Sequence, residues 1–197
     1  MKKTNTILIE DDPYGELRFE GESLPYIAGG KSDNSVLFGS FSKTLSPGMR
    51  IGFLCTTNKE LMGHLIAAKQ ASDLHTNALA QYAIFDYLQH NDYDAHIRKI
   101  TELYKVQCNA MLTAMEKYFP AHVTYTKPEG GMFLWVDLGE GVSSVDVFKR
   151  ATEKKVAFVP GDPFYTNISG ASTLRLNYTN SDPATIEEGI KRLASVL

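Results

Sequence analysis

The apolar residues in the first third of the chain form short runs that are separated by turn residues. Each run is continuous rather than alternating, which is typical of strands covered on both faces of a sheet. The first run ends in acidic residues, and the two later runs flank the loop 40–50. This pattern predicts three strands, at 6–10, 35–39 and 51–56.

Apolar residues at helical spacing dominate the middle of the chain. The clearest stripe contains Ile97, Ile100, Tyr104 and Met111, which recur at intervals of three, four and seven. Pro120 ends the stripe, because proline cannot continue a helix. We therefore predict helices at 59–72, 78–89 and 92–118, the first of them capped by Asn58.

Shorter elements follow Pro120, and this change predicts two domains, 1–91 and 92–197, the second entered through the long helix. Ser143 with Asp146 resembles a capping box, and Asp182 before Pro183 is typical of a helix start. The expected elements are strands at 123–126, 132–138, 157–159 and 173–178, and helices at 143–154 and 183–197.

Composition and charge narrow the function classes. The chain has 197 residues, of which 43% are hydrophobic and 22% charged, as is usual for a globular protein. A net charge of −3 predicts no basic face for nucleic acid or anionic lipid. No apolar run is long enough to span a membrane, and no signal peptide follows Met1, so we expect a cytoplasmic protein without membrane contact.

The cysteines and histidines indicate neither a disulfide framework nor a metal site. Cys55 and Cys108 are expected to be reduced thiols. The five histidines show no paired ligand spacing, so we expect no metal site.

The stretch SFSKTLSPGMR, from Ser40 to Arg50, contains the candidate chemistry. Lys43 follows a predicted buried strand, where burial and a nearby cation favour a neutral, nucleophilic amine. Ser40 and Ser42 offer hydroxyls, and Arg50 offers a planar set of donors suited to phosphate. A phosphate site beside an amine matches pyridoxal phosphate, whose aldehyde forms a Schiff base with lysine.

A carboxylate is also needed to keep the pyridine nitrogen of this cofactor protonated. Ends of parallel strands gather at one edge of a sheet, so the acidic end of strand 6–10 should lie near Lys43. Asp11 is the candidate, Asp12 is its rival, and Tyr14 is placed to donate to the ring hydroxyl.

Four motifs together resemble the class I/II aminotransferases of the type I fold. They are IEDDPYGEL (9–17), SFSKT (40–44) with Arg50, PEGGMF (128–133) and LRLNY (174–178). The run ASDLHT (71–76) is similar to the branch with 2-aminoadipate and kynurenine aminotransferases. The resemblance implies an α/β fold: the C-terminal part of the large domain, with three strands and helices, followed by a small α+β domain.

The resemblance also implies a role for each candidate residue. Lys43 would carry the Schiff base and move a proton between the substrate Cα and the cofactor, while Arg175 would bind the substrate α-carboxylate. The residues implied in cofactor binding are Asp11 at the pyridine nitrogen, Tyr14 at the ring hydroxyl, and Ser40, Ser42 and Arg50 at the phosphate.

Members of that family are about twice as long, so this chain resembles their C-terminal half. The resemblance further implies that a missing strand separates strands 6–10 and 35–39, which would leave unpaired edges. We expect self-association through such edges, as a homodimer or otherwise, or reassociation with a separate half. We also expect weak or absent cofactor binding and no turnover by this chain alone.

Other interpretations stay open from the sequence. A different enzyme of the same fold, such as a carbon–sulfur lyase, would use the same residues. A non-catalytic effector module of a regulator would also retain the fold. Lys43 and Arg50 could be ordinary loop cations, Tyr14 a packing residue, and Arg175 a solvent-facing strand residue. The preferred amino acid is not indicated.

Overall fold

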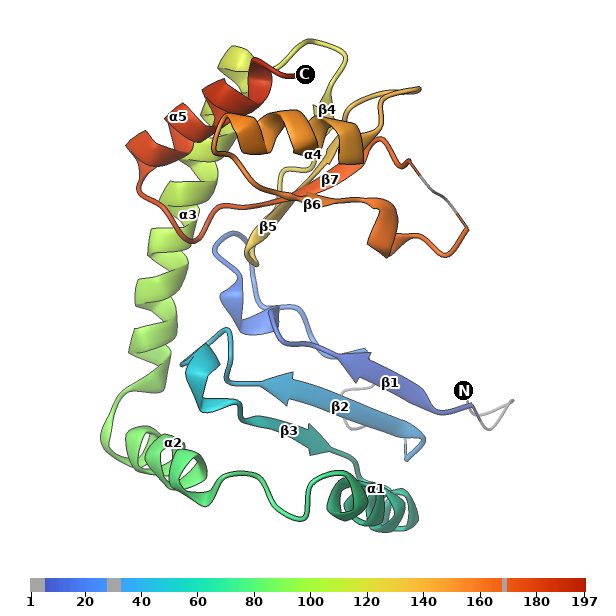
Figure 1. Cartoon of the computed structure of the whole chain (residues 1–197). Coiled ribbons are helices and arrows are strands. Elements are labelled where there is room, and N and C mark those ends of the chain that lie inside the picture. Colours follow the sequence, from blue (N-terminus) through green and yellow to red (C-terminus); the bar gives the residue numbers. More distant parts are fainter. Residues whose placement is uncertain (1–5, 28–32, 168–169) are drawn as a thin grey trace. The chain divides into compact units, whose positions relative to one another are not determined.

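The computed structural model describes residues 6–27, 33–167 and 170–197. The chain divides into two compact units, Met1–Arg98 and Lys99–Leu197 (Figure 1). In the described part of the chain, no helix is both long and apolar enough to cross a membrane.

A three-stranded sheet forms the centre of the first unit. Its order is β1 (Leu8–Asp11), β2 (Ser35–Ser40) and β3 (Gly52–Cys55). β1 and β2 are parallel and directly paired, with Asp11 opposite Phe38, whereas β3 runs antiparallel to β2 (Figure 1). The expectation that a missing strand separates the first two strands was therefore wrong, because their backbones are hydrogen-bonded to each other.

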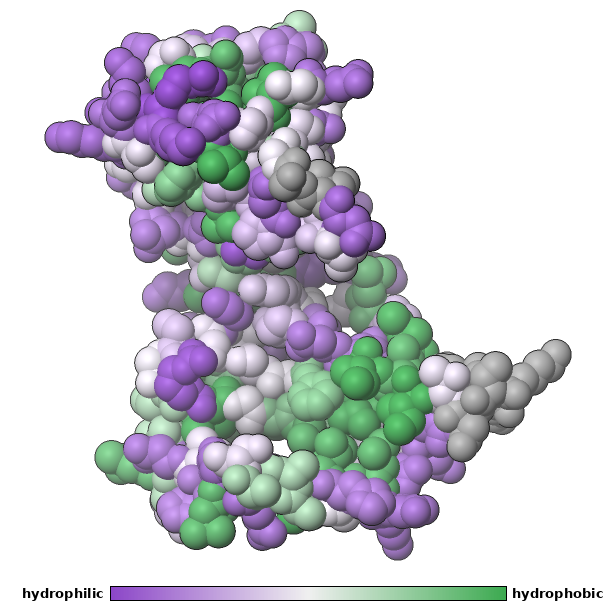
Figure 2. All heavy atoms as spheres, turned by 45° about the vertical axis from the view of Figure 1, so that its right-hand side comes forward, coloured by the Kyte–Doolittle hydropathy of each residue, from purple (hydrophilic) through white to green (hydrophobic). Residues whose placement is uncertain are grey.

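The sheet of the first unit is not covered on both faces, contrary to the expectation from its apolar runs. Ile9 on β1 is 65% exposed and Phe53 on β3 is 44% exposed. Figure 2 shows apolar side chains gathered into a patch on this unit. Among the described residues, β1 and β3 each pair with β2 alone, so each has a free edge.

Two helices follow the sheet in the first unit. α1 (Lys59–Ser72) is capped by Asn58, whose side chain accepts from the Leu61 amide, as predicted. α2 (Ala78–His90) is capped by Asn77 in the same way. α1 buries no described residue and α2 buries only Ile84, so neither helix forms a full core with the sheet.

The second unit, in contrast, has a closed core. The last part of α3 (Tyr93–Tyr118) packs there through Met111 and Met115. The sheet is antiparallel, in the order β4, β5, β7, β6, with α4 and α5 after β5 and β7. The bounds are β4 (Thr124–Tyr125), β5 (Phe133–Asp137), α4 (Ser144–Glu153), β6 (Val159–Pro160), β7 (Thr173–Asn177) and α5 (Pro183–Ala194).

Strand alternation gives the second sheet two different faces. Leu134 and Leu174 are fully buried. Phe133, Trp135 and Arg175 alternate with such residues and are only partly buried, so they belong to the opposite face.

Asp182→Ala is expected to lower the unfolding temperature of the chain by a few degrees at neutral pH. The Asp182 carboxylate caps α5 by accepting from the Ala184 and Thr185 amides at 3.0 and 3.1 Å. Hydrogen bonds from Thr185 lower the pKa of the Asp182 carboxyl, and the hydroxyl of Thr185 has a larger effect than its amide. Thermal unfolding of both proteins at several pH values measures the difference.

The lowered pKa sets the direction of the pH dependence of this cap. The contribution is present above the ordinary carboxyl pKa and is lost as the pH falls through the lowered, folded-state value. The difference between Asp182→Ala and the parent should therefore shrink in acid. A difference that persists well below that pKa would show that the ionised cap is not its source.

Candidate functional site

The carboxyl ends of β1 and β2 bring two candidate residues to one edge of the first sheet. β1 ends at Asp11, which pairs with Phe38 of β2. β2 continues two residues beyond Phe38 and ends at Ser40. Asp11 is exposed. In the described ranges its carboxylate has no recorded hydrogen bond or ion pair, so it is available to a ligand.

Asp12, the rival for the same role, has a structural task. Its Oδ1 accepts from the Tyr14 and Gly15 amides at 3.3 and 2.7 Å, which closes the turn after β1. The turn leads into η1 (Gly15–Leu17), where Leu17 is completely buried. This assignment favours Asp11 as the free carboxylate.

Lys43 lies in a tight turn directly after β2. The Phe41 carbonyl accepts from the Leu45 and Ser46 amides, both at 2.9 Å, and this closes the turn around Lys43. The lysine is half-buried, and no hydrogen bond or ion pair of its ammonium is recorded within the described residues.

The three candidate phosphate residues are linked to one another. Ser40 Oγ accepts from the Ser42 amide at 3.1 Å. Arg50 Nη1 lies 3.4 Å from Ser42 Oγ and donates to the Pro47 carbonyl at 3.2 Å, across η2 (Pro47–Met49). Arg50 has a φ of 56°, the left-handed conformation in which it ends η2.

A cavity of about 220 Å³ lies next to this edge. Its lining includes Asp12, Ser40 and Tyr93, but not Asp11, Tyr14, Lys43 or Arg50. The structure thus places Ser40 and Asp12, the rival of Asp11, at a cavity, whereas Asp11, Tyr14, Lys43 and Arg50 are not part of its lining.

Tyr93 is a residue of this cavity that the sequence analysis missed. Its hydroxyl donates to Glu16 Oε2 at 2.9 Å, and burial, together with this acidic partner, raises the pKa of Tyr93 to about 12. The only signal in the sequence was a tyrosine at the start of a helix, which does not indicate a cavity.

Arg175 lies in the second unit, among aromatic rings. Its Cζ is 4.1 Å from the centroid of the Phe133 ring and 5.0 Å from that of Phe164, in η3 (Asp162–Phe164). Its Nε is enclosed by protein and has no hydrogen-bond partner in the described chain. Arg175 is therefore not an ordinary solvent-facing strand arginine.

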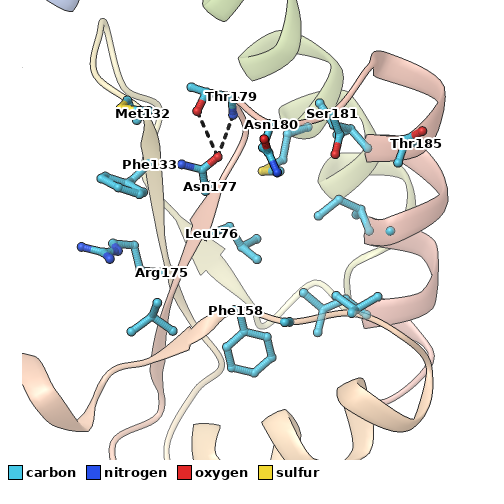
Figure 3. A pocket seen from close by; sticks show the side chains of 18 of the residues that line it. Met132, Phe133, Phe158, Arg175, Leu176, Asn177, Thr179, Asn180, Ser181 and Thr185 are labelled. Atoms are coloured by element: carbon cyan, nitrogen blue, oxygen red, sulfur yellow. Dashed lines mark hydrogen bonds between the residues drawn. The ribbon is translucent and has the colours of Figure 1, made fainter. Parts of the chain in front are cut away.

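Figure 3 shows a larger pocket of the second unit, of about 690 Å³. Arg175 and Phe133 point to one side of β7, whereas Leu176 and Phe158 point to the other. All four residues line the pocket. Phe164 and Trp135, which complete the surroundings of Arg175, were missed by the sequence analysis. The alternate aromatic residues of β5 were the available signal.

Several known proteins are similar to this chain. The family model for aminotransferase class I and II matches residues 1–193. The aromatic-amino-acid aminotransferase 1 of Thermococcus litoralis is 42% identical over 97% of this chain and 46% of its own length. The 2-aminoadipate transaminase of Thermus thermophilus is 40% identical over 97% of this chain and 49% of its own length.

A solved structure agrees with these matches. The alpha-aminoadipate aminotransferase LysN of Thermus thermophilus, in complex with N-(5'-phosphopyridoxyl)-L-leucine, superposes with a TM-score of 0.94 at 38% identity. The match covers 100% of this chain and 51% of LysN, so the chain spans about half the length of these relatives. A family model that matches nearly every residue shows that this chain belongs to the class I and II aminotransferases.

Proposed function

We propose that this chain supplies the lysine-bearing half of an aminotransferase site, which moves an amino group between an amino acid and a 2-oxo acid. The observation that carries the proposal is the grouping at the end of the first sheet. Within the described part of the chain, Lys43 and Asp11 have no hydrogen-bond or ion-pair partner, and Ser40, Ser42 and Arg50 form a connected set of donors.

The residues present fit pyridoxal phosphate. The hydroxyls of Ser40 and Ser42, together with the Arg50 guanidinium, form a donor set suited to phosphate oxygens. Asp11 offers an exposed carboxylate for the pyridine nitrogen, and Lys43 an amine for the aldehyde. We assign Tyr14, in the turn after β1, to the ring hydroxyl.

The cofactor, when bound, withdraws electrons from the substrate Cα and so makes its proton acidic. Lys43 Nζ is assigned the transfer of that proton, which requires an amine that is not held by an acidic neighbour. The half-buried position and the absence of a recorded ion pair, within the described residues, meet this requirement. The charge of Asp11 would keep the pyridine nitrogen protonated.

Arg175 is assigned the α-carboxylate of the amino acid or 2-oxo acid. Guanidinium binds carboxylate through two parallel hydrogen bonds. The enclosed Nε leaves the terminal nitrogens of Arg175 to meet the ligand. Each of these substrates carries an α-carboxylate that Arg175 can bind. Aromatic amino acids and 2-aminoadipate, named for the relatives, are the first to test.

We assign residues 1–91 to cofactor binding and 92–197 to a second domain, whereas the compact units divide slightly later, between Arg98 and Lys99. Because the chain spans about half of its relatives, we expect it to bind the cofactor weakly or not at all by itself, without turnover. We also propose a cytoplasmic location, and association as a dimer or through the free edges of β1 and β3.

The function is tested in a chimera in which this chain replaces the matching segment of the Thermococcus litoralis relative. With pyridoxal phosphate, an amino donor and 2-oxoglutarate, we expect formation of glutamate and of the 2-oxo acid of the donor. A carbon–sulfur lyase would instead release ammonia and pyruvate from cysteine-like substrates. A folded chimera that forms no glutamate would overturn the proposal.

A further inference from the structure

The turn η3 is fastened to the strand that carries Arg175. The Gly161 amide, just before η3, donates to the Thr173 carbonyl at 2.7 Å. Thr173 Oγ1 donates to the Tyr165 hydroxyl, just after η3, at 3.2 Å. A Cβ at Gly161 would collide with Thr173, so only glycine allows this approach. Thr173, which lies two residues before Arg175, therefore holds both ends of the turn.

A second set of contacts fixes the turn from its other side. The Asp162 carboxylate accepts from the Gly170 and Ala171 amides at 2.5 and 3.2 Å. Phe164 packs edge to face on Trp135, with ring centroids 5.0 Å apart, and Trp135 is paired with Arg175 across β5 and β7. Phe164 is therefore held against the strands in two ways: by the hydrogen bonds of its neighbours in the chain, and by the contact of its own ring with Trp135.

We propose that Phe164 is a positioning residue, which holds the Arg175 guanidinium, together with Phe133, in one orientation for a carboxylate ligand. Rings at 4.1 and 5.0 Å from Cζ attract the guanidinium through cation–π interaction. The enclosed Nε shows that one side of the group is already withdrawn from water. This ordering lowers the entropy that a carboxylate must overcome on binding.

The inference rests on the proposed carboxylate role of Arg175, but the orientation itself is measurable without cofactor or ligand. Phe164→Leu removes the ring and keeps an apolar side chain, and Phe164→Tyr keeps the ring. Phe164 is 47% exposed, so neither change should unfold the second unit. Far-UV circular dichroism checks that point.

The first readout is the Nε–H proton signal of Arg175 in the whole chain, assigned by its loss in Arg175→Gln. In the parent we expect a ring-shifted signal that exchanges slowly with water. Phe164→Leu should move the signal and increase its exchange about tenfold, whereas Phe164→Tyr should retain it. An unchanged signal in Phe164→Leu overturns the inference.

The second readout is binding of 2-oxoglutarate, followed by the fluorescence of Trp135, the only tryptophan in the chain. We expect Phe164→Leu to weaken binding about tenfold, Phe164→Tyr to leave it near the parent, and Arg175→Gln to abolish it. Unchanged affinity in Phe164→Leu overturns only the positioning role of Phe164. Unchanged affinity in Arg175→Gln overturns the proposed role of Arg175, and the two failures are therefore distinct.

Discussion

Lys43→Ala is expected to slow amino transfer by the chimera by about 10²- to 10⁴-fold, the usual contribution of a positioned acid–base group. The variant loses the amine assigned both to attach the cofactor and to move the Cα proton. Lys43 makes no recorded hydrogen bond in the described chain, so alanine removes no structural contact of the ammonium. Steady-state rates at saturating pyridoxal phosphate measure the effect.

Lys59→Ala is the matched control for this prediction. Lys59 is an exposed lysine in the first turn of α1, and its loss should leave the rate near that of the parent. If Lys43→Ala turned over as fast as Lys59→Ala, Lys43 would be an ordinary loop lysine. That is the alternative that the sequence left open.

Ile9→Lys is expected to weaken self-association of the chain by about 10- to 100-fold, the effect of removing one large apolar side chain from an interface. Ile9 is 65% exposed on β1, beside the free edge of that strand. A lysine there adds a charge, as natural edge strands do to prevent pairing. Sedimentation over a range of concentrations gives the dissociation constant.

Val106→Lys provides the comparison, because Val106 is 56% exposed on α3 within the closed second unit. This change should leave association unaltered. A parent chain that is monomeric at all concentrations, or equal weakening by both variants, would show that the sheet of the first unit is not the contact surface.

Local chemistry in the sequence predicted the elements well. Asn58 and Asp182 cap helices where expected, since a side-chain oxygen followed by free amides is a local signal. The Ser143 hydroxyl likewise lies 3.4 Å from the Asp146 amide at the start of α4. Such signals need no knowledge of distant residues.

Pairing and coverage of the first sheet were harder to predict. Apolar runs indicate strands but not their neighbours, so the direct pairing of β1 with β2 was missed. The same runs suggested covered faces, yet Ile9 and Phe53 are exposed. The runs identified apolar strands correctly but could not show what covers them.

The site was only partly predictable for a related reason. The sequence indicated Lys43 and Asp11 by their places after predicted strands, and the resemblance to the aminotransferases implied the role of Arg175. The position of the Phe164 ring depends on how η3 is tied to β7, which is a contact between segments. No periodicity or motif along the chain reports such a contact.

Reductive trapping most directly tests the central assignment, that the amine at position 43 attaches the cofactor. The unmodified chain is mixed with excess pyridoxal phosphate, reduced with borohydride, digested, and mapped by mass spectrometry. Reduction makes even a weakly held attachment permanent. The assignment predicts that Lys43 carries most of the label, and that Asp11→Asn lowers this share. Label spread over the surface lysines, as in the urea-unfolded chain, would contradict it.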